Sequence, residues 1–152
     1  MQRYASHLTG QTPMPELTEA QQQEHLDQIN TDIHYQNIAL GHLYEEAGSY
    51  EDQATRMRSL AAGLTTAIQP LRSAFNDIRS LHTTQTWEGR AATASRARLD
   101  GHEIRHNAAI RSIDALIDDL EAGAAVAEQR HSTTLGEIGD VRWQIHLLEE
   151  QR

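Results

Sequence analysis

Apolar side chains recur along the chain in steps of three and four residues, the spacing that places them on one face of an α-helix. In the first half this stripe keeps one phase from Leu26 to His82, and only Gln36 and His82 are plainly polar. Its members are Leu26, Ile29, Ile33, Gln36, Leu40, Leu43, Ala47, Tyr50, Ala54, Met57, Ala61, Leu64, Ile68, Leu71, Phe75, Ile78 and His82. Because a broken helix has no reason to preserve phase, the pattern predicts one helix of about 65 residues, roughly 100 Å long.

Local signals mark where this helix begins and where it could break. Thr18 and Gln21 form a candidate capping box after a leader, residues 1–17, that contains Pro13 and Pro15. The alternative to one helix is a break at Gly48, because residues 49–52 could cap a new one. Pro70 lies off the stripe, where it could kink the helix without ending it.

The second half carries a stripe of the same kind from Leu99 to Leu148. Its members are Leu99, Glu103, His106, Ile110, Ile113, Ile117, Leu120, Ala124, Ala127, His131, Thr134, Ile138, Val141, Ile145 and Leu148. Apolar contact is thin between His131 and Gly136, where a new helix could be capped. The expected arms are residues 18–84 and 90–150, with a bend at 85–89.

Two helices of nearly equal length joined by a short loop lie antiparallel, each covering the stripe of the other. The sequence therefore predicts an all-α fold, a long antiparallel hairpin of two helices of about 60 residues bent at Trp87-Glu88-Gly89. A tryptophan can wedge into such a corner, and a glycine frees the backbone to turn.

A second apolar row accompanies the stripe near the bend, with Leu60, Ala67, Ala74 and Leu81 in the first arm and Ile104, Ala108, Ala115 and Leu116 in the second. One partner helix cannot cover two rows, so we expect this half to pack against another hairpin as a four-helix bundle. The alternative is a merely wide amphipathic face. The predicted partner-binding residues are Leu60, Leu64, Ala67, Leu71, Ala74, Phe75, Ile78, Leu81, Ile104, Ala108 and Leu116.

Composition and charge favour an elongated protein that binds other proteins. Only 38% of the residues are hydrophobic and 5% aromatic, which is thin for a globular core. A net charge of −9 argues against nucleic acid as a partner, although the segment 53–112 holds nine arginines and four acidic residues. These arginines could dock an acidic partner or anionic lipid, whereas the ordinary role is a solvated face with local ion pairs. The arginines near the bend are Arg72, Arg79, Arg90, Arg96, Arg98, Arg105 and Arg111.

One motif suggests an enzyme. His102-Glu103-Ile104-Arg105-His106 matches H-E-x-x-H, in which two histidines one helical turn apart bind zinc and the glutamate activates water. A third ligand from Glu121 or Glu128 on the same helix would lie roughly 20 Å or more away. We therefore expect a structural role for these residues, with no catalytic residue, no metal and no cofactor; the alternatives are adventitious metal binding by the two histidines and a zinc peptidase.

Four histidines, His42, His82, His106 and His131, lie on or beside the predicted packed faces. Protonation of a buried imidazole would disfavour packing, so pH-triggered dissociation is a hypothesis beside the ordinary role of satisfied histidines.

The bend and its surroundings resemble a known family. Trp87 and Gly89 are followed by Ala91, Ala92, Ala94 and Leu99, and preceded by Leu71, Phe75, Ile78 and Leu81 at helical spacing. This resembles the WXG family, the small early-secreted-antigen-like proteins of type VII (ESX) secretion. The resemblance covers roughly residues 54–127 and implies a helical hairpin that pairs as a homodimer or heterodimer with another WXG-like protein. It also implies that Trp87 and Gly89 set the bend and engage the secretion machinery.

Two departures from the family pattern limit what the resemblance implies. About fifty residues precede the matching region, and the Y-x-x-x-D/E export signal is missing, because no tyrosine has an acidic residue four positions later. The signal is then carried by a partner or is unfamiliar, or the protein assists secretion without being exported.

The expected function is that of a secreted substrate or co-secreted partner, exported without a cleavable signal peptide, which contacts the secretion machinery and a larger effector. The alternatives are a cytoplasmic adaptor or chaperone for such an effector and a general coiled-coil scaffold. Membrane contact stays open.

Overall fold

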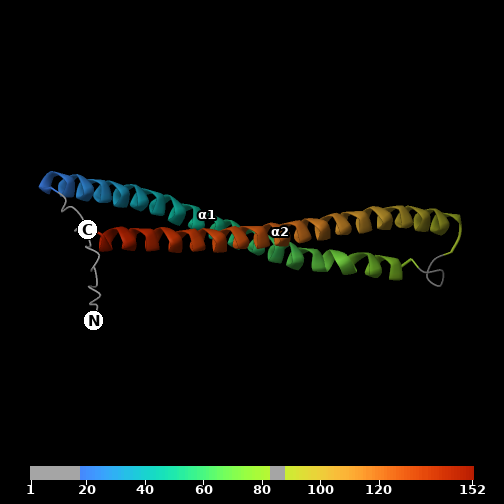
Figure 1. The fold of residues 1–152 in the computed structure, drawn as a ribbon. Helices are drawn as coiled ribbons and strands as arrows, with labels where there is room; N and C mark the ends of the chain where they lie inside the picture. Colours follow the sequence, from blue (N-terminus) through green and yellow to red (C-terminus); the bar gives the residue numbers. More distant parts are fainter. Residues whose placement is uncertain (1–17, 83–87) are drawn as a thin grey trace, which may run out of the picture.

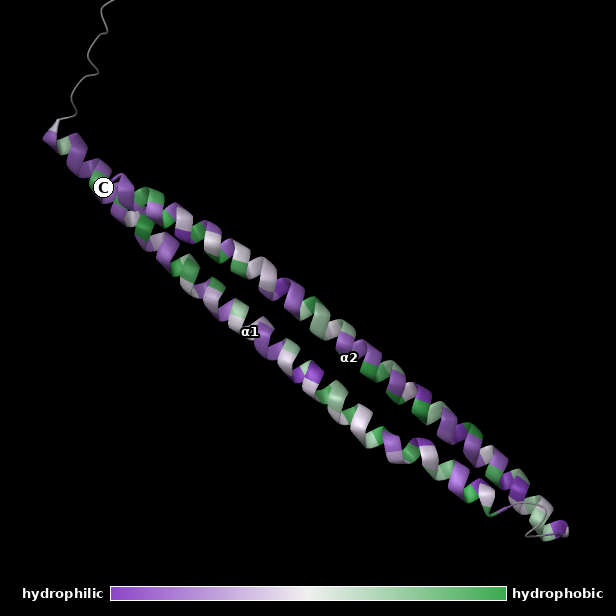
Figure 2. Cartoon of the chain, turned by 90° about the horizontal axis from the view of Figure 1, so that it is seen from below, coloured by the Kyte–Doolittle hydropathy of each residue, from purple (hydrophilic) through white to green (hydrophobic). Residues whose placement is uncertain are grey.

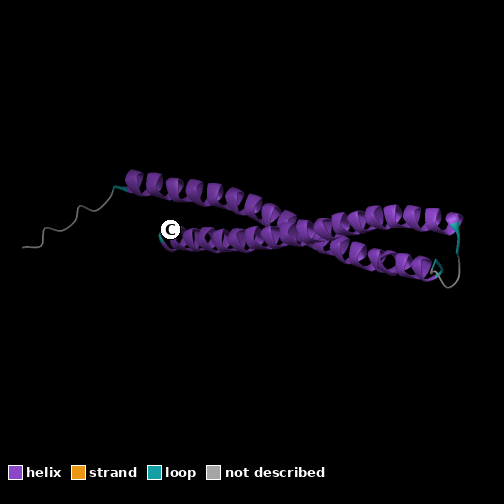
Figure 3. Cartoon of the chain, turned by 90° about the vertical axis from the view of Figure 1, so that its right-hand side faces the viewer, coloured by secondary structure: helices purple, strands orange, loops and turns teal. Residues whose placement is uncertain are grey.

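The computed structural model describes residues 18–82 and 88–152, and in these residues the chain forms two long helices (Figure 1). Helix α1 spans Glu19–Ser80 and helix α2 spans Arg90–Glu150. The two helices pack against each other, and the described chain contains only helix and loop (Figure 3). The predicted fold class, an all-α antiparallel hairpin, is confirmed. At 1.5 Å per residue each helix is roughly 92 Å long.

The ends of α1 follow from local hydrogen bonds. Thr18 donates its backbone N–H to Gln21 Oε1 at 3.0 Å, and Gln21 donates its backbone N–H to Thr18 Oγ1 at 3.4 Å. The predicted capping box is therefore present. The helix ends at Ser80, earlier than the predicted residue 84, and the N–H groups of Leu81 and His82 close its last turn on the carbonyls of Ile78 and Arg79.

Both helices are continuous at the two places where the sequence allowed a break. α1 continues past Gly48 and includes Pro70, and α2 continues through residues 131–136. Ala47 and Ala54 on either side of Gly48 are 4% and 5% exposed, so the seam between the helices holds this segment in place. Tertiary packing thus outweighs the local capping signals.

The core is a narrow seam along the two predicted stripes. Its central part consists of small side chains, Ala47, Ala54, Ala61, Ala124 and Ala127, and larger residues, Ile29, Ile68 and Ile138, are buried farther from the middle. Small residues let two helix backbones approach closely. The helices cross in Figure 1 and run side by side in Figure 2, so they wind about each other as in a coiled coil.

Candidate interaction surface

The seam between α1 and α2 has two flanks, and in the half near the bend one of them is closed by ion pairs. Three arginines of α1 reach carboxylates of α2 on this charged flank. Arg58 pairs with Glu128, Arg72 with Asp114, and Arg79 with Asp100 and Glu103. Two of the arginines that the sequence offered for an external partner, Arg72 and Arg79, are therefore engaged within the hairpin.

The pair between Arg58 and Glu128 has the best defined geometry on this flank. Arg58 donates from Nε and Nη2 to the two carboxylate oxygens at 2.7 and 2.8 Å, a bidentate arrangement. The hydrogen bond from Arg58 lowers the pKa of the Glu128 carboxyl below its ordinary value. Both side chains are half exposed, so the bridge fixes how the helices face each other more than it adds stability.

The opposite flank can be traced from a groove at the middle of the hairpin. Gln53, Met57, Gly123, Val126 and Arg130 line this groove of about 290 Å³. A side chain at Gly123 would meet Met57 Sδ at 2.9 Å, so the glycine makes room for Met57. Nearby, the Arg130 guanidinium lies over the Tyr50 ring, 5.8 Å from its centroid.

From this groove toward the bend, every seventh residue continues the same flank, because a coiled coil repeats every seven residues. Starting at Gln53, the α1 row contains Leu60, Ala67, Ala74 and Leu81. Starting at Gly123, the α2 row contains Leu116, Ala109 and His102. We call these two rows, with Leu71 and Ile78 beside them, the apolar flank.

The apolar flank exposes large side chains that the hairpin itself leaves uncovered. Leu60 is 59% exposed and Leu116 is 48% exposed. Leu71 and Ile78 belong to the predicted inner stripe, yet they are 48% and 41% exposed. No charged residue stands in the two rows that form this flank. The half near the bend therefore has one flank closed by charge pairs and one apolar flank open to a partner.

The predicted partner-binding residues divide into three groups in the structure. Leu60, Ala67, Ala74 and Leu81 lie together on the apolar flank with Leu71, Ile78 and Leu116. Leu64 and Phe75 are half buried in the seam. Ile104 and Ala108 fall, by the seven-residue repeat, on the outer surface of α2 and do not join the flank. Sequence reasoning missed Ala109, which the seven-residue row from Gly123 places on the flank.

The residues of the H-E-x-x-H motif each have different neighbours in the structure. His106 is half buried with its ring 4.8 Å from the Phe75 ring, Glu103 pairs with Arg79, and His102 is exposed beside Arg105. Among the described residues, no three metal-binding side chains come together. His82 and His131 are half buried and His42 is exposed.

The bend contributes one described residue of unusual geometry. Gly89 precedes the first residue of α2 with φ 108° and ψ 178°, and its carbonyl accepts the Thr93 N–H at 3.0 Å. This backbone conformation is essentially restricted to glycine. Trp87, the other residue predicted to set the bend, lies outside the described residues.

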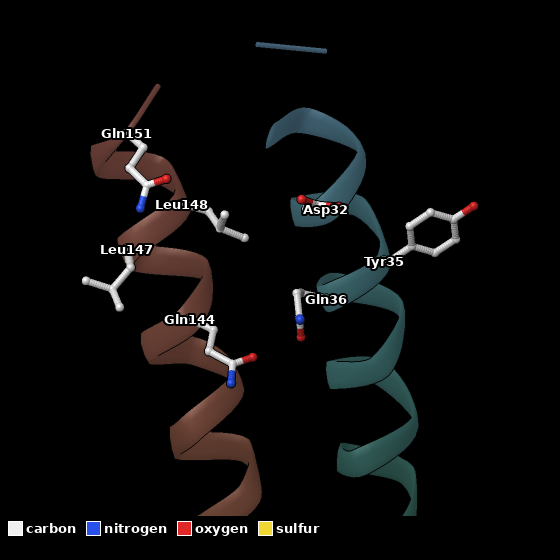
Figure 4. Close-up of a pocket in the computed structure, with 7 residues that line it drawn as sticks. All are labelled: Asp32, Tyr35, Gln36, Gln144, Leu147, Leu148 and Gln151. Atoms are coloured by element: carbon white, nitrogen blue, oxygen red, sulfur yellow. The ribbon is translucent and has the colours of Figure 1, made fainter. Parts of the chain in front are cut away.

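A groove that the sequence did not predict lies at the open end of the hairpin, about 410 Å³ in volume. Asp32, Tyr35, Gln36, Gln144, Leu147, Leu148 and Gln151 line it. In Figure 4, Gln36 and Leu148 lie between the two helices, while the Tyr35 ring and Leu147 point outward. Asp32 belongs to the same seven-residue row as Gln53, so this groove opens on the side of the apolar flank.

Fold and surface together define a class of protein, a long antiparallel helical hairpin with a one-sided apolar flank near its bend. Neither described helix is long and apolar enough to cross a membrane. No protein-family model, curated protein or solved structure matches the chain.

Proposed function

We propose that this chain is a WXG-type helical protein of a type VII secretion system, a secreted substrate or co-secreted partner that acts by binding other proteins. The observation that carries the proposal is the apolar flank, which leaves Leu60, Leu71 and Leu116 about half exposed in the half of the hairpin that resembles the family. Apolar patches of this kind mark interaction sites. The proposed activity includes no catalytic step, cofactor or metal.

The bend supports the proposal through Gly89. A family member needs a tight corner between its arms at W-x-G, and Gly89 has the glycine-restricted conformation at the corresponding place.

The first test follows the tagged protein in culture filtrate of its native host, with and without the type VII secretion ATPase. Release that depends on the ATPase is the expected result. Retention in cells with the ATPase present would overturn export and favour the second candidate, a cytoplasmic adaptor or chaperone for a type VII effector. The missing Y-x-x-x-D/E signal is the observation that favours this candidate.

A second test separates the proposal from a general coiled-coil scaffold. Replacing Trp87 by Ala should abolish export or partner binding if W-x-G engages the machinery. Trp143, 59% exposed on α2 far from the bend, provides the matched control, and Trp143→Ala should leave both unchanged. If Trp87→Ala and Trp143→Ala had the same effect on export and partner binding, the W-x-G motif would have no specific role in either.

A further inference from the structure

We propose that the groove between Glu46 and Glu137, in the half of the hairpin away from the bend, binds one calcium ion that bridges α1 and α2. The inference goes beyond the proposed function and does not rest on it. The ion is structural, so the proposed activity itself needs no metal. Two observations carry the inference: a pair of carboxylates that face each other across the seam, and a buried hydroxyl without a partner in the protein.

Glu46 and Glu137 lie opposite each other on the side of the seam that carries the apolar flank. Gln53 and Arg130 line one groove at the middle of the hairpin, and one seven-residue step toward the open end leads from them to Glu46 and Glu137. Both glutamates line a groove of about 230 Å³. Within the described part of the chain neither forms an ion pair.

This arrangement of charges differs from that of the charged flank. There, arginines of α1 meet carboxylates of α2, as in the pairs Arg58–Glu128 and Arg72–Asp114. Glu46 and Glu137 instead bring two negative charges to one groove. Both side chains are exposed, so water screens their repulsion and the hairpin tolerates them without an ion. Carboxylates are also the charged ligands that Ca²⁺ prefers.

The buried hydroxyl belongs to Thr134, which lines the same groove. Thr134 is 4% exposed, and it is the only buried polar residue among those that the structure describes. Its neighbour Thr133 donates its hydroxyl to the Gln129 carbonyl at 3.0 Å, whereas Thr134 makes no side-chain hydrogen bond within the described residues. No side-chain oxygen of these residues is both fully buried and unpartnered, so the Thr134 oxygen reaches the groove. An unpaired hydroxyl beside two carboxylates indicates a ligand that is held by oxygen atoms.

These groups suit Ca²⁺ better than Mg²⁺. Ca²⁺ accepts about six to eight oxygen ligands in irregular geometry, whereas Mg²⁺ requires a nearly ideal octahedron. Glu46 Oε1 accepts the Tyr50 hydroxyl at 2.8 Å, which orients the carboxylate and leaves Oε2 for the ion. The Glu137 carboxylate, the Thr134 hydroxyl and the side-chain carbonyl of Gln129 are the other protein ligands, and water fills the remaining positions.

Arg130 limits the affinity of this site. It also lines the groove, and its guanidinium lies over the Tyr50 ring, 5.8 Å from the ring centroid. Two carboxylates and one guanidinium leave a net charge of −1 in the groove. We therefore expect a Kd on the order of 10⁻⁴–10⁻³ M, the range of extracellular Ca²⁺ modules. Arg130→Gln removes the opposing charge and should lower the Kd by roughly threefold to tenfold.

Isothermal titration calorimetry of the full chain with CaCl₂ tests the site. About 0.15 M NaCl screens the diffuse attraction of cations to a chain of net charge −9. Wild type should bind one ion, and Glu137→Gln, which removes a ligand, should raise the Kd at least tenfold. Glu149→Gln is the matched control, because it removes the same charge from an exposed position of α2 outside the groove. Its Kd should equal that of the wild type.

A second variant tests the hydroxyl. Thr134→Val keeps the shape of the side chain and removes only the oxygen ligand, so the seam should stay packed and the helicity by circular dichroism should not change. The Kd for Ca²⁺ should rise by threefold or more. An unchanged Kd would contradict the inference, because the buried hydroxyl would then not face the ion.

Thermal unfolding tests whether the ion bridges the two arms. CaCl₂ at about ten times the Kd should raise the Tm of the wild type by roughly 3–6 °C. MgCl₂ at the same concentration should raise it less, and Glu137→Gln should respond equally to the two salts. Equal shifts of the wild type in CaCl₂ and MgCl₂ would reduce the effect to ionic strength and overturn the inference.

The calorimetric outcomes also decide the proposal. Binding that Glu137→Gln weakens and Glu149→Gln leaves intact supports it. No binding by the wild type, or equal loss in both variants, overturns it. All these measurements use purified protein, so they are independent of export. Ca²⁺ binding without ATPase-dependent release would keep this inference and reject the secretion role, and release without Ca²⁺ binding would do the reverse.

Discussion

At the residue scale, the backbone of Gly89 is the feature most sensitive to a small change. Its φ of 108° and ψ of 178° put it in a region that costs other residues of order 1–3 kcal/mol. An added Cβ meets nothing within 4 Å, so the cost of a substitution is conformational and not steric. We expect Gly89→Ala to lower the free energy of unfolding by about 1–3 kcal/mol in urea denaturation.

Gly48 supplies the control for this prediction. It lies inside α1 with open space around its Cβ position. Alanine has the higher helix propensity, so Gly48→Ala should raise the free energy of unfolding by roughly 0.5–1 kcal/mol. If the free energy of unfolding changed in the same direction in both variants, the backbone conformation of Gly89 would not explain the effect of its substitution.

Also at the residue scale, the contribution of Glu128 to stability depends on pH. The hydrogen bond from Arg58 lowers the pKa of its carboxyl, so folding favours the charged form. That contribution is present at neutral pH and is lost as the pH falls through the lowered pKa, below the ordinary glutamate value of about 4.3. Glu128→Gln should therefore be less stable than the wild type at pH 7, and the difference should vanish in strong acid.

Thermal unfolding between pH 2 and pH 7 measures this difference. Glu137→Gln is a suitable comparison, because Glu137 makes no ion pair within the described residues, and its Tm should follow the wild type. If the Tm of Glu128→Gln followed that of the wild type across the whole pH range, the ion pair with Arg58 would not contribute to stability.

At the element scale, the small residues of the central seam determine how closely α1 and α2 approach. Ala54 is 5% exposed, and the seam around it is built from other alanines. Ala54→Leu should overpack this seam and lower the free energy of unfolding by about 1–3 kcal/mol. Ala62→Leu, an exposed position on the same helix, should change it by less than about 0.5 kcal/mol. A tolerated leucine at position 54 would mean that the helices are not held close there.

The elements also show what could be predicted from the sequence. The constant phase of the apolar stripes predicted both helices and the continuity of α1 through Gly48. This prediction holds because the burial of Ala47 and Ala54 outweighs a local capping signal. The partners of Arg58 and Arg72 depend on the alignment of the two arms. That alignment follows from packing across the seam, and the periodicity of either helix alone does not contain it.

At the scale of the whole molecule, charge and apolar surface are distributed unevenly along the rod. The apolar flank occupies only the half near the bend, and acidic residues gather toward the open end. A protein partner that binds through the apolar flank would therefore contact the half near the bend and leave the acidic open end exposed.

Small-angle scattering tests how the two arms are staggered. Asp32 and Gln151 line the same groove at the open end, so α1 extends about 13 residues, roughly 20 Å, past the end of α2. Arg79 pairs with Asp100 near the bend, so α2 extends about 10 residues, roughly 15 Å, past α1. The maximum dimension of a single hairpin should therefore be about 105 Å, whereas arms in full register would give about 92 Å. A maximum dimension well under about 80 Å would contradict two continuous arms.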